Sequence, residues 1–460
     1  MKAIRVHSYG QPPRLDDVPE PQVTGPDDVI VRIGGAGLCR TDLHIIDGWF
    51  ADVIPSELPL VLGHENAGWI HAVGPAVDHL VVGDPVICHP NLTCGVCRAC
   101  RAGDDMRCAR GPDLPGLTRA GGMAELFKTR SRAIVKLVAG AEPTEVAALA
   151  DAGLTAYHAV GKAAPALGAG SSAVVVGVGG LGHIGIQCLK AMTMAEVIAV
   201  DISEEALKLA MDCGADHLVT AGGQQAQQVR DLTGPGADAI FDFVGEDATI
   251  GDSVAMLRPG GTYYLIGYGG TVTFPTVPLI LGEISIVANL IGTSTDLADL
   301  VTLAGQGKVK LRSSSYPLEA ASDAIQDLRH GRIHGRAILA PSTGISTLAN
   351  RSGGPFRARR HRMATLHIEH PITDFGTWKA AFDRFAEARE RSGVRGHRIL
   401  RPVDDAHYVV IDLDFQTASE AEKFLGFLQT TVWASTQSAP ALAGTPQARI
   451  LEPVDAAPGN

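Results

Sequence analysis

The chain has 460 residues, too many for one ordinary domain, and its length predicts two to four domains. Hydrophobic residues make up 45% and charged residues 19%, a balance typical of a globular rather than a disordered protein. The net charge of −11 argues against nucleic acid as the main partner, because binding to phosphate backbones usually needs a basic face.

The N-terminal stretch MKAIRVHSYG lacks the apolar segment of a signal peptide, and the longer apolar runs are interrupted by Gly, His or Lys. We therefore expect a cytoplasmic protein with no membrane partner. Thiols stay free in that reducing compartment, so closely spaced cysteines are expected to hold a metal rather than to form disulfides.

Residues 1–150 are rich in Gly and Pro and contain short runs such as DDVIVRIGGAGL and VVGDPVICHP, which predict a β-rich, barrel-like domain. Four cysteines of this part have the spacing C-x2-C-x2-C-x7-C: Cys94, Cys97, Cys100 and Cys108. Four thiolates fill a tetrahedral zinc shell and leave no position for substrate, so the pattern predicts a structural zinc site. An iron–sulfur cluster is the chemical alternative, but the bacterial ferredoxin run ends in C-x3-C-P and this one does not.

A second group of metal-binding residue types stands earlier, in GLCRTDLH and LGHENAG. Cys39, His64 and Glu65 are suitable ligands separated by a loop. A catalytic zinc uses three protein ligands and keeps one position open. Each residue alone would be unremarkable, since a lone Cys usually lies in the core, but the group next to the cysteine lobe indicates a catalytic metal site.

From Ser172 onward, short apolar runs alternate with segments of helical spacing. AVVVG, EVIAVD, DAIFDFVG, GTYYLIG and ISIVANLIG are typical of buried parallel strands, and GGLGHIGIQCLKAM, SEEALKLAMDCG and DATIGDSVAML have helical periodicity. Repeated βαβ units of this kind predict a doubly wound α/β sheet.

The first strand of this region leads into a dinucleotide-binding motif. Gly177, Gly179 and Gly182 form G-x-G-x-x-G between a predicted strand and a predicted helix. The glycines let the backbone approach a pyrophosphate, and the helix N-terminus supplies N–H donors. Asp201 closes the next strand, nineteen residues after Gly182, where an acid can bind ribose hydroxyls and would repel a 2′-phosphate. The pattern therefore favours NAD over NADP.

Residues 342–362 are Ser/Gly-rich and then basic, without an apolar period, and predict a linker, with a nucleic-acid-binding tract as the alternative. Residues 363–455 then have the order β-α-β-β-α-β of a ferredoxin-like α+β domain. Four histidines lie on or beside its predicted strands: His367, His370, His397 and His407. They either line a small-molecule or metal pocket or are exposed strand positions.

Over residues 1 to about 341 the chain resembles the medium-chain, zinc-containing alcohol dehydrogenases. The resemblance rests on CRTDLH at 39–44, GHENAG at 63–68, the cysteine lobe, DAGLTAYHA at 151–159 and GVGGLGHIG at 177–185. It implies a GroES-like catalytic domain over 1–155, completed by 292–341, and a Rossmann NAD-binding domain over 156–291.

The resemblance also implies roles for single residues. Cys39 and His64 would bind catalytic zinc, with Glu65 as a close or alternating ligand. Liver-type members use a cysteine as third ligand, but this chain has none between Cys108 and Cys188 and carries Asp151 instead, as in the bacterial secondary-alcohol type. Such a shell is harder and is expected to lose zinc more readily during purification.

Further expectations follow from the same family. Thr41 and His44 would pass on the proton of the substrate alcohol. NAD would be held by the following residues: Arg40, Gly177, Gly179, Gly180, Leu181, Gly182, Asp201 and Arg336. The implied protein is a homodimer or homotetramer with two zinc ions per chain, one catalytic and one structural, and it interconverts a primary or secondary alcohol with an aldehyde or ketone.

The region after about residue 362 departs from that family, whose chains end near RAILAP. It resembles, in shape alone, small dimeric α/β-barrel proteins of the antibiotic-biosynthesis monooxygenase type. This resemblance implies a fusion and a second interface between subunits. A second function class is a non-catalytic nucleotide-binding protein whose added module recruits a partner. Zinc-free quinone reductases share the fold but lack both zinc motifs, so they do not fit.

Overall fold

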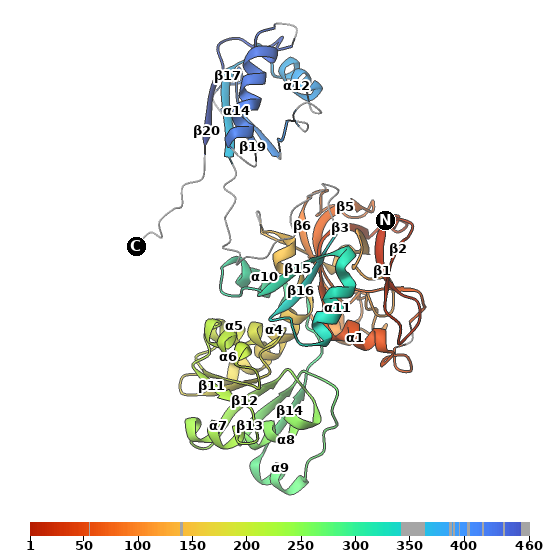
Figure 1. Cartoon of the computed structure of the whole chain (residues 1–460), viewed down its shortest axis with the longest axis vertical. Helices are drawn as coiled ribbons and strands as arrows, with labels where there is room; N and C mark the ends of the chain where they lie inside the picture. The colour runs from red at the N-terminus through yellow and green to blue at the C-terminus, as the bar shows by residue number, and fades with distance from the viewer. Residues whose placement is uncertain are drawn as a thin grey trace. The chain divides into compact units, whose positions relative to one another are not determined.

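The computed structural model of the chain forms two compact units, Met1–Ser346 and Thr347–Asn460 (Figure 1). It describes residues 1–54, 56–138, 141–341, 364–385, 389, 392–394, 396–402, 405–415, 418–435 and 438–451. The linker expected at 342–362 lies outside the described residues. Each unit is described by itself below.

A six-stranded parallel sheet occupies the second half of the first unit. Its strands are β9 (Ser172–Val176), β10 (Glu196–Asp201), β11 (His217–Thr220), β12 (Ala237–Asp242), β13 (Leu257–Leu265) and β14 (Ser285–Ala288). Their order is β11-β10-β9-β12-β13-β14. The order reverses between β9 and β12, so a topological switch point lies beside β9, the strand that leads into the glycine motif.

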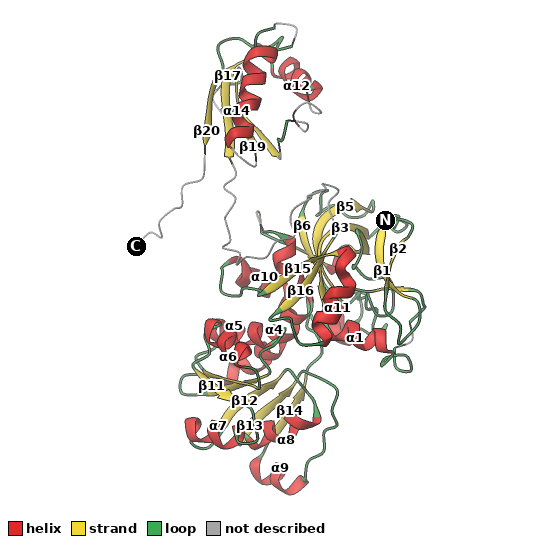
Figure 2. Cartoon of the chain, viewed as in Figure 1, coloured by secondary structure: helices red, strands yellow, loops and turns green. Residues whose placement is uncertain are grey.

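Helices cover both faces of this sheet (Figure 2). They are α4 (Ala152–Ala163), α5 (Gly182–Met192), α6 (Glu204–Asp212), α7 (Gln225–Thr233), α8 (Asp247–Ala255) and α9 (Thr276–Gly282). Helix α6 begins where Ser203 accepts a hydrogen bond from the Ala206 N–H, as expected of an N-cap serine. The predicted doubly wound sheet is confirmed.

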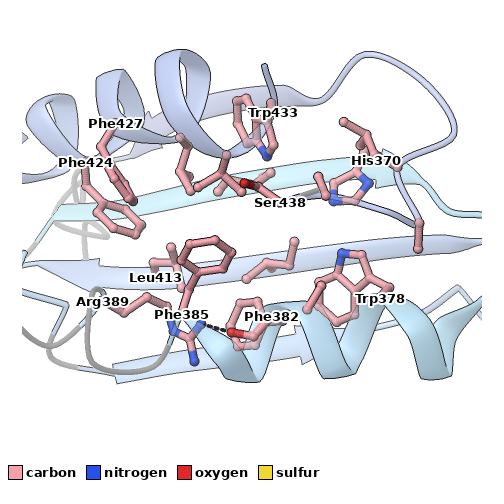
Figure 3. A pocket seen from close by; sticks show the side chains of 18 residues that line it. His370, Trp378, Phe382, Phe385, Arg389, Leu413, Phe424, Phe427, Trp433 and Ser438 are labelled. Carbon is pink, nitrogen blue, oxygen red and sulfur yellow. Dashed lines mark hydrogen bonds between the residues drawn. The ribbon is translucent and has the colours of Figure 1, made fainter. Parts of the chain in front are cut away.

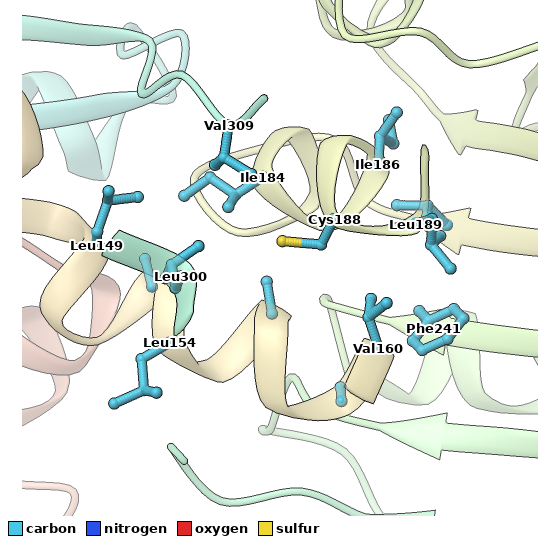
Figure 4. Close-up of a cluster of buried hydrophobic side chains, with 14 of the residues drawn as sticks. Leu149, Leu154, Val160, Ile184, Ile186, Cys188, Leu189, Phe241, Leu300 and Val309 are labelled. Carbon is cyan, nitrogen blue, oxygen red and sulfur yellow. The ribbon is translucent and has the colours of Figure 1, made fainter. Parts of the chain in front are cut away.

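The largest apolar core lies on the α4 and α5 face of the sheet (Figure 4). Leu154 and Val160 of α4 contribute to the same cluster as Cys188 of α5 and Phe241 of β12, and all four are buried. Helix α10 (Ser294–Gly305) adds Leu300 to the cluster. This core supports α4, whose first residue follows Asp151.

The remainder of the first unit is β-rich. A seven-stranded sheet contains β3 (Asp28–Leu38), β5 (Glu65–Val73), β6 (Pro85–Cys88), β7 (Leu126–Arg130), β8 (Ile134–Lys136), β15 (Ser313–Pro317) and β16 (Arg336–Ala340). A smaller sheet has the order β2 (Arg14–Asp17), β1 (Lys2–Val6), β4 (Leu60–Val61). After the six-stranded parallel sheet, the chain returns to the seven-stranded sheet, where β16 pairs with β3.

Short helices connect these strands. They are α1 (Arg40–Asp47), α2 (Arg98–Arg101), α3 (Pro143–Val146) and α11 (Ala321–Arg329), with 3-10 turns at Asp105–Arg107, Ser131–Ala133, Ala147–Ala150, Ala164–Ala166 and Leu318–Ala320. Helix α1 begins directly after β3 at Cys39, so the end of that strand and the start of the helix fix the position of this cysteine.

The second unit contains a four-stranded antiparallel sheet with two main helices. Its strands are β17 (Ala364–Pro371), β18 (Gly396–Leu400), β19 (Tyr408–Phe415) and β20 (Gln447–Leu451), in the order β18-β19-β17-β20. Helix α12 spans Phe375–Arg384, and α14 spans Ala418–Phe427 and continues into a π-helical turn at Leu428–Val432. Among the described residues of the whole chain, no helix combines the length and apolar character needed to cross a bilayer.

Leu154 provides a test of the core beside α4. We expect Leu154→Ala to lower the free energy of unfolding by about 2–5 kcal/mol, because the fully buried side chain leaves a cavity. Met211→Ala is the matched control, since Met211 is 61% exposed on α6 and its truncation should change stability by about 0.5 kcal/mol or less. Urea titrations of both variants measure the difference, and equal midpoints would contradict this description of the core.

Candidate active site and metal centres

A cleft within the first unit brings both sheets together. It encloses about 1200 Å³ of empty space, its open mouth included. Cys39, His64 and Asp151 line one part, and residues that follow β12 and β13, Val244 and Tyr268 among them, line another. The carboxyl edge of the parallel sheet therefore faces the metal-binding residue types of the β-rich part.

Four of the predicted ligands form one cluster in this cleft. The ligand atoms of Cys39, His64, Glu65 and Asp151 all lie within 4.8 Å of one another. Antiparallel pairing of β3 with β5 sets Gly37 opposite Glu65, which brings Cys39 close to His64. Tetrahedral zinc separates its ligand atoms by roughly 3.3–3.8 Å, so small side-chain movements would complete a shell.

The imidazole of His64 is buried, and neither ring nitrogen makes a hydrogen bond within the described part of the chain. Nδ1 lies 3.4 Å from Asp42 Oδ1, and Nε2 lies 3.5 Å from Asp151 Oδ2. Burial opposes protonation, but the two carboxylates outweigh it and raise the pKa of His64 well above its usual value. A buried imidazole without hydrogen bonds and in a field of negative charge fits a cation held through Nε2.

Asp42 was not among the residues predicted from the sequence. Its carboxylate is fully buried, accepts the Cys39 N–H at 2.8 Å and faces Nδ1 of His64. Metal-binding histidines commonly donate their second N–H to a carboxylate, which orients the ring. The signal that could have revealed it is its position three residues after Cys39, where an acidic side chain can reach back to the first residue of the turn.

Glu65 is engaged by other groups. Its Oε1 accepts the Ala152 N–H at 3.1 Å, and its Oε2 forms an ion pair with the buried guanidinium of Arg336. Burial raises the pKa of Glu65, and the Arg336 charge opposes that rise. The remaining three residues of the cluster supply one thiolate, one imidazole and one carboxylate, which is a chemically suitable zinc shell.

Thr41 and His44 lie on α1 at the rim of the cleft, together with Tyr268, which was not predicted. The Tyr268 hydroxyl lies 2.6 Å from Thr41 Oγ1 and 3.3 Å from His44 Nδ1. The His44 ring stacks on Trp49 at a centroid distance of 4.2 Å. Tyr268 follows β13 at the carboxyl edge of the parallel sheet, where ligands bind in such folds, and this position was its only signal in the sequence.

The glycine loop has the geometry expected for phosphate binding. Gly177 has a φ of +84°, which favours glycine, and a Cβ on Gly182 would lie 1.9 Å from the Gly177 carbonyl oxygen. A Cβ on Gly179 would meet no atom within 4 Å, so space remains there for a ligand. Asp201 accepts the Val178 N–H at 2.7 Å, which ties the loop to the end of β10. Leu181 lines the cleft.

The two predicted arginines lie in different environments. Arg40 is exposed on the cleft wall, where its Nη1 is 3.5 Å from Glu246 Oε1. Arg336 is buried, and a Cβ on Gly180 would lie 2.7 Å from its side chain. Arg336 therefore contacts the glycine loop on one side and Glu65 on the other.

The cysteine lobe forms a second cluster. The sulfur atoms of Cys94, Cys97, Cys100 and Cys108 lie within 4.8 Å of one another, and all eight cysteines of the chain are free. Backbone N–H groups point at the sulfurs, since the Cys94 N–H donates to Cys108 and the Cys97 N–H to Cys94. At Cys97, the backbone N–H groups of Ala109 and then Cys100 lower the pKa of the thiol to about 6, which favours the thiolate that a metal binds.

Comparisons with known proteins agree with this arrangement. The family described as "Alcohol dehydrogenase GroES-like domain" matches residues 25–139, and "Zinc-binding dehydrogenase" matches residues 180–306. An NAD-dependent alcohol dehydrogenase of Sulfurisphaera tokodaii is 34% identical over 351 residues, which cover 74% of this chain and all of that protein.

Two solved structures extend the comparison. An alcohol dehydrogenase of Aeropyrum pernix matches with 46% identity and a TM-score of 0.72, covering 74% of this chain and all of its own. An acetophenone reductase of Geotrichum candidum in complex with NAD matches with 30% identity and a TM-score of 0.68, covering 75% of this chain and 98% of its own.

A GroES-like part joined to a Rossmann sheet, with a cleft between them, defines a nucleotide-dependent oxidoreductase. The chain belongs to the medium-chain, zinc-containing alcohol dehydrogenase family. The predicted combination of a GroES-like fold with a Rossmann fold is thereby confirmed. Both family matches end before residue 307, so the second unit lies outside them.

Asp42 provides a test of the cleft cluster. We expect Asp42→Asn to weaken zinc binding there by about 10- to 100-fold, because the negative charge beside His64 Nδ1 is lost. Competition with a chelator measures the affinity. Asp47→Asn on the same helix is the control, since Asp47 instead pairs with Arg329 and should leave the affinity unchanged. Equal affinities of wild type and Asp42→Asn would refute the proposed support of His64.

Proposed function

We propose that the chain oxidises primary or secondary alcohols to aldehydes or ketones with NAD, and catalyses the reverse reduction, in the cleft of its first unit. The observation that carries this proposal is the buried His64, free of hydrogen bonds, in a Cys/His/Asp cluster that shares a cleft with the edge of the parallel sheet. Relatives named NAD-dependent alcohol dehydrogenases support it. A non-catalytic nucleotide-binding role is not favoured.

Cys39, His64 and Asp151 would hold the catalytic zinc, and the four-cysteine lobe a structural one, which makes two per chain. The glycine loop and Asp201 would hold NAD, with Arg40 and Arg336 near the pyrophosphate. When bound, zinc would supply Lewis-acid activation of the alcohol oxygen, and NAD would accept the carbinol hydride.

The chain's own residues handle the proton that the alcohol loses. Thr41 lies beside Cys39, with the Cys39 sulfur 3.6 Å from its Oγ1, and so can accept a hydrogen bond from an alcohol at the cluster. The Tyr268 hydroxyl spans Thr41 and His44. Neutral His44, at the outer edge of the cleft, takes up the proton and releases it to water.

The cleft wall favours an apolar substrate. Phe50, Leu114, Leu117 and Ile291 line it, together with Phe243. Apolar walls of this kind select substrates by the area that they bury. We therefore propose medium-length or aromatic alcohols, and the similarity to an acetophenone reductase supports an aromatic secondary alcohol as a candidate.

We further propose that the second unit is a ferredoxin-like domain and that the protein is a homodimer or homotetramer. Two observations support that fold. The sheet has the strand order β18-β19-β17-β20, and along the chain a helix follows the first strand, β17, and the third strand, β19. The eight free cysteines support the predicted cytoplasmic location, which stays a prediction. The domain boundaries and the linker also stay predictions. Sizing of the full chain measures the oligomer.

The first test is made on the purified wild type. We expect two zinc ions per chain by metal analysis and NAD reduction, followed by absorbance, with a panel of primary, secondary and aromatic alcohols. The largest kcat/KM should belong to apolar or aromatic members, because of the cleft wall. One zinc per chain and no turnover, persisting after zinc is added back, would overturn the proposal in favour of a nucleotide-binding role.

The pH dependence tests the role of His44. Burial and then the Arg40 charge lower the pKa of His44, so its neutral, proton-accepting form persists to lower pH than for an ordinary histidine. We expect His44→Gln to slow alcohol oxidation by about 100-fold near neutral pH. The ratio of wild-type to variant kcat/KM should fall only below the ordinary histidine pKa of about 6.5.

His217→Gln is the control for this experiment, because His217 lies on β11, at the edge of the parallel sheet. Its pH profile should match that of the wild type. A rate ratio between wild type and His44→Gln that does not change with pH would argue against proton uptake by His44.

A further inference from the structure

The second unit contains a cavity that neither the family matches nor the proposed reaction explains. It lies between the sheet and the helices α12 and α14, and encloses about 690 Å³ of empty space, its mouth included (Figure 3). Ile368 of β17 and Ile411 and Leu413 of β19 form its floor. The space opens to solvent at its mouth, and the side chains that line it leave room for part of a small molecule to enter between the sheet and the helices.

The wall of this cavity is strongly aromatic. Six of the described lining residues are Phe or Trp: Trp378, Phe382, Phe385, Phe424, Phe427 and Trp433. Trp378 stacks with Phe382 at a centroid distance of 5.2 Å, and Phe424 contacts Phe427 at 5.8 Å. Figure 3 shows these rings facing the central space from both helices. Such walls favour a flat, aromatic guest, because ring stacking adds to the burial of apolar area.

A few polar atoms interrupt the apolar wall at one end. His370 is buried, and its Nδ1 lies 3.0 Å from the Pro371 carbonyl oxygen. A carbonyl oxygen can only accept, so Nδ1 carries the proton and Nε2 is left as an acceptor. Burial lowers the pKa of His370, which keeps the ring neutral. Among the described residues, nothing hydrogen-bonds to Nε2.

Among the described residues of the wall, Arg389 is the one charged side chain, and it makes two contacts of its own. Arg389 donates to the Phe382 carbonyl oxygen, and its guanidinium lies 3.7 Å from the centroid of the Phe382 ring. A cationic guest would meet the like charge of this guanidinium and would lose its hydration without gaining an opposite charge. The other described residues of the wall are mainly apolar and aromatic, which favours an uncharged guest.

We propose that the second unit binds a planar, uncharged aromatic molecule that carries a hydroxyl group, with its ring between the helices and its hydroxyl donating to Nε2 of His370. This site is separate from the alcohol-oxidising cleft, and the proposal does not rest on the proposed reaction. It assigns the cavity a ligand by shape, by aromatic content and by the free acceptor on His370.

The test uses two matched probes, 2-naphthol and 2-methoxynaphthalene, which share a ring system but differ in the hydroxyl donor. Isothermal titration calorimetry on the full chain at pH 7 should show 2-naphthol binding about 10-fold more tightly, the effect of about one well-formed hydrogen bond. In His370→Phe this preference should disappear, because 2-naphthol weakens about 10-fold and 2-methoxynaphthalene does not.

His367→Phe is the matched control. His367 lies on the same strand but pairs with Asp412, and the alternation of β17 places it on the opposite face of the sheet. Its affinity for both probes should equal that of the wild type. Neither phenol nor ether can be oxidised at a carbinol carbon, so turnover does not disturb the measurement.

A second variant guards against a failure of His370→Phe to fold. Ser438 lines the cavity and is only half-buried, so Ser438→Trp should fill the space without disturbing the sheet, and circular dichroism checks the fold. We expect this variant to lose binding of both probes. The proposal is overturned if the wild type binds neither probe, if His370→Phe keeps the preference for 2-naphthol, or if Ser438→Trp binds both probes unchanged.

Discussion

The buried ion pair between Glu65 and Arg336 is the contact on which the geometry of the cleft depends. Removing one partner of such a pair leaves an uncompensated buried charge, which costs about 3–5 kcal/mol. Glu65 also accepts the N–H of Ala152, next to Asp151, and Arg336 packs against Gly180 of the glycine loop. One pair of charges thus connects the Cys39, His64 and Asp151 cluster, the start of α4 and the glycine loop.

Glu65 lies among the candidate metal-ligand atoms, and its carboxylate is at the same time paired with Arg336. Its carboxylate balances the Arg336 charge, whereas the charge near His64 comes from Asp42 and Asp151. Two acid groups raise the pKa of His64, and one arginine beside Glu65 opposes the effect of burial on that carboxyl. Within a few ångströms the site therefore contains two carboxylates that face His64 and a third carboxylate whose charge is balanced by Arg336.

The two units use histidine differently. In the first unit, His64 and His44 line the cleft beside carboxylates and hydroxyls, among them Asp42, Asp151 and Tyr268. In the second unit, His370 offers an acceptor to an aromatic cavity, and His367 on the other face of the same strand is held by Asp412. The two-residue period of β17 separates these neighbours, so the sequence grouping of four histidines does not correspond to one site.

Local sequence determined the elements and the ligand types of this protein. The alternation of apolar runs and helical segments predicted the doubly wound sheet, and the spacing of Cys94, Cys97, Cys100 and Cys108 predicted their cluster, because both depend on residues close together in the chain. Asp151 was reached only through a family resemblance, since more than a hundred residues separate it from Cys39.

Only the tertiary structure decided the contacts between distant segments. The bridge from Tyr268 to Thr41 and His44 joins residues more than two hundred positions apart, and neither periodicity nor spacing records such a pair. The cavity beside His370 likewise depends on how two helices pack over a sheet. The space that their side chains leave unfilled cannot be read from the residue types alone. Sequence thus determined which groups are present, and packing decided which of them meet.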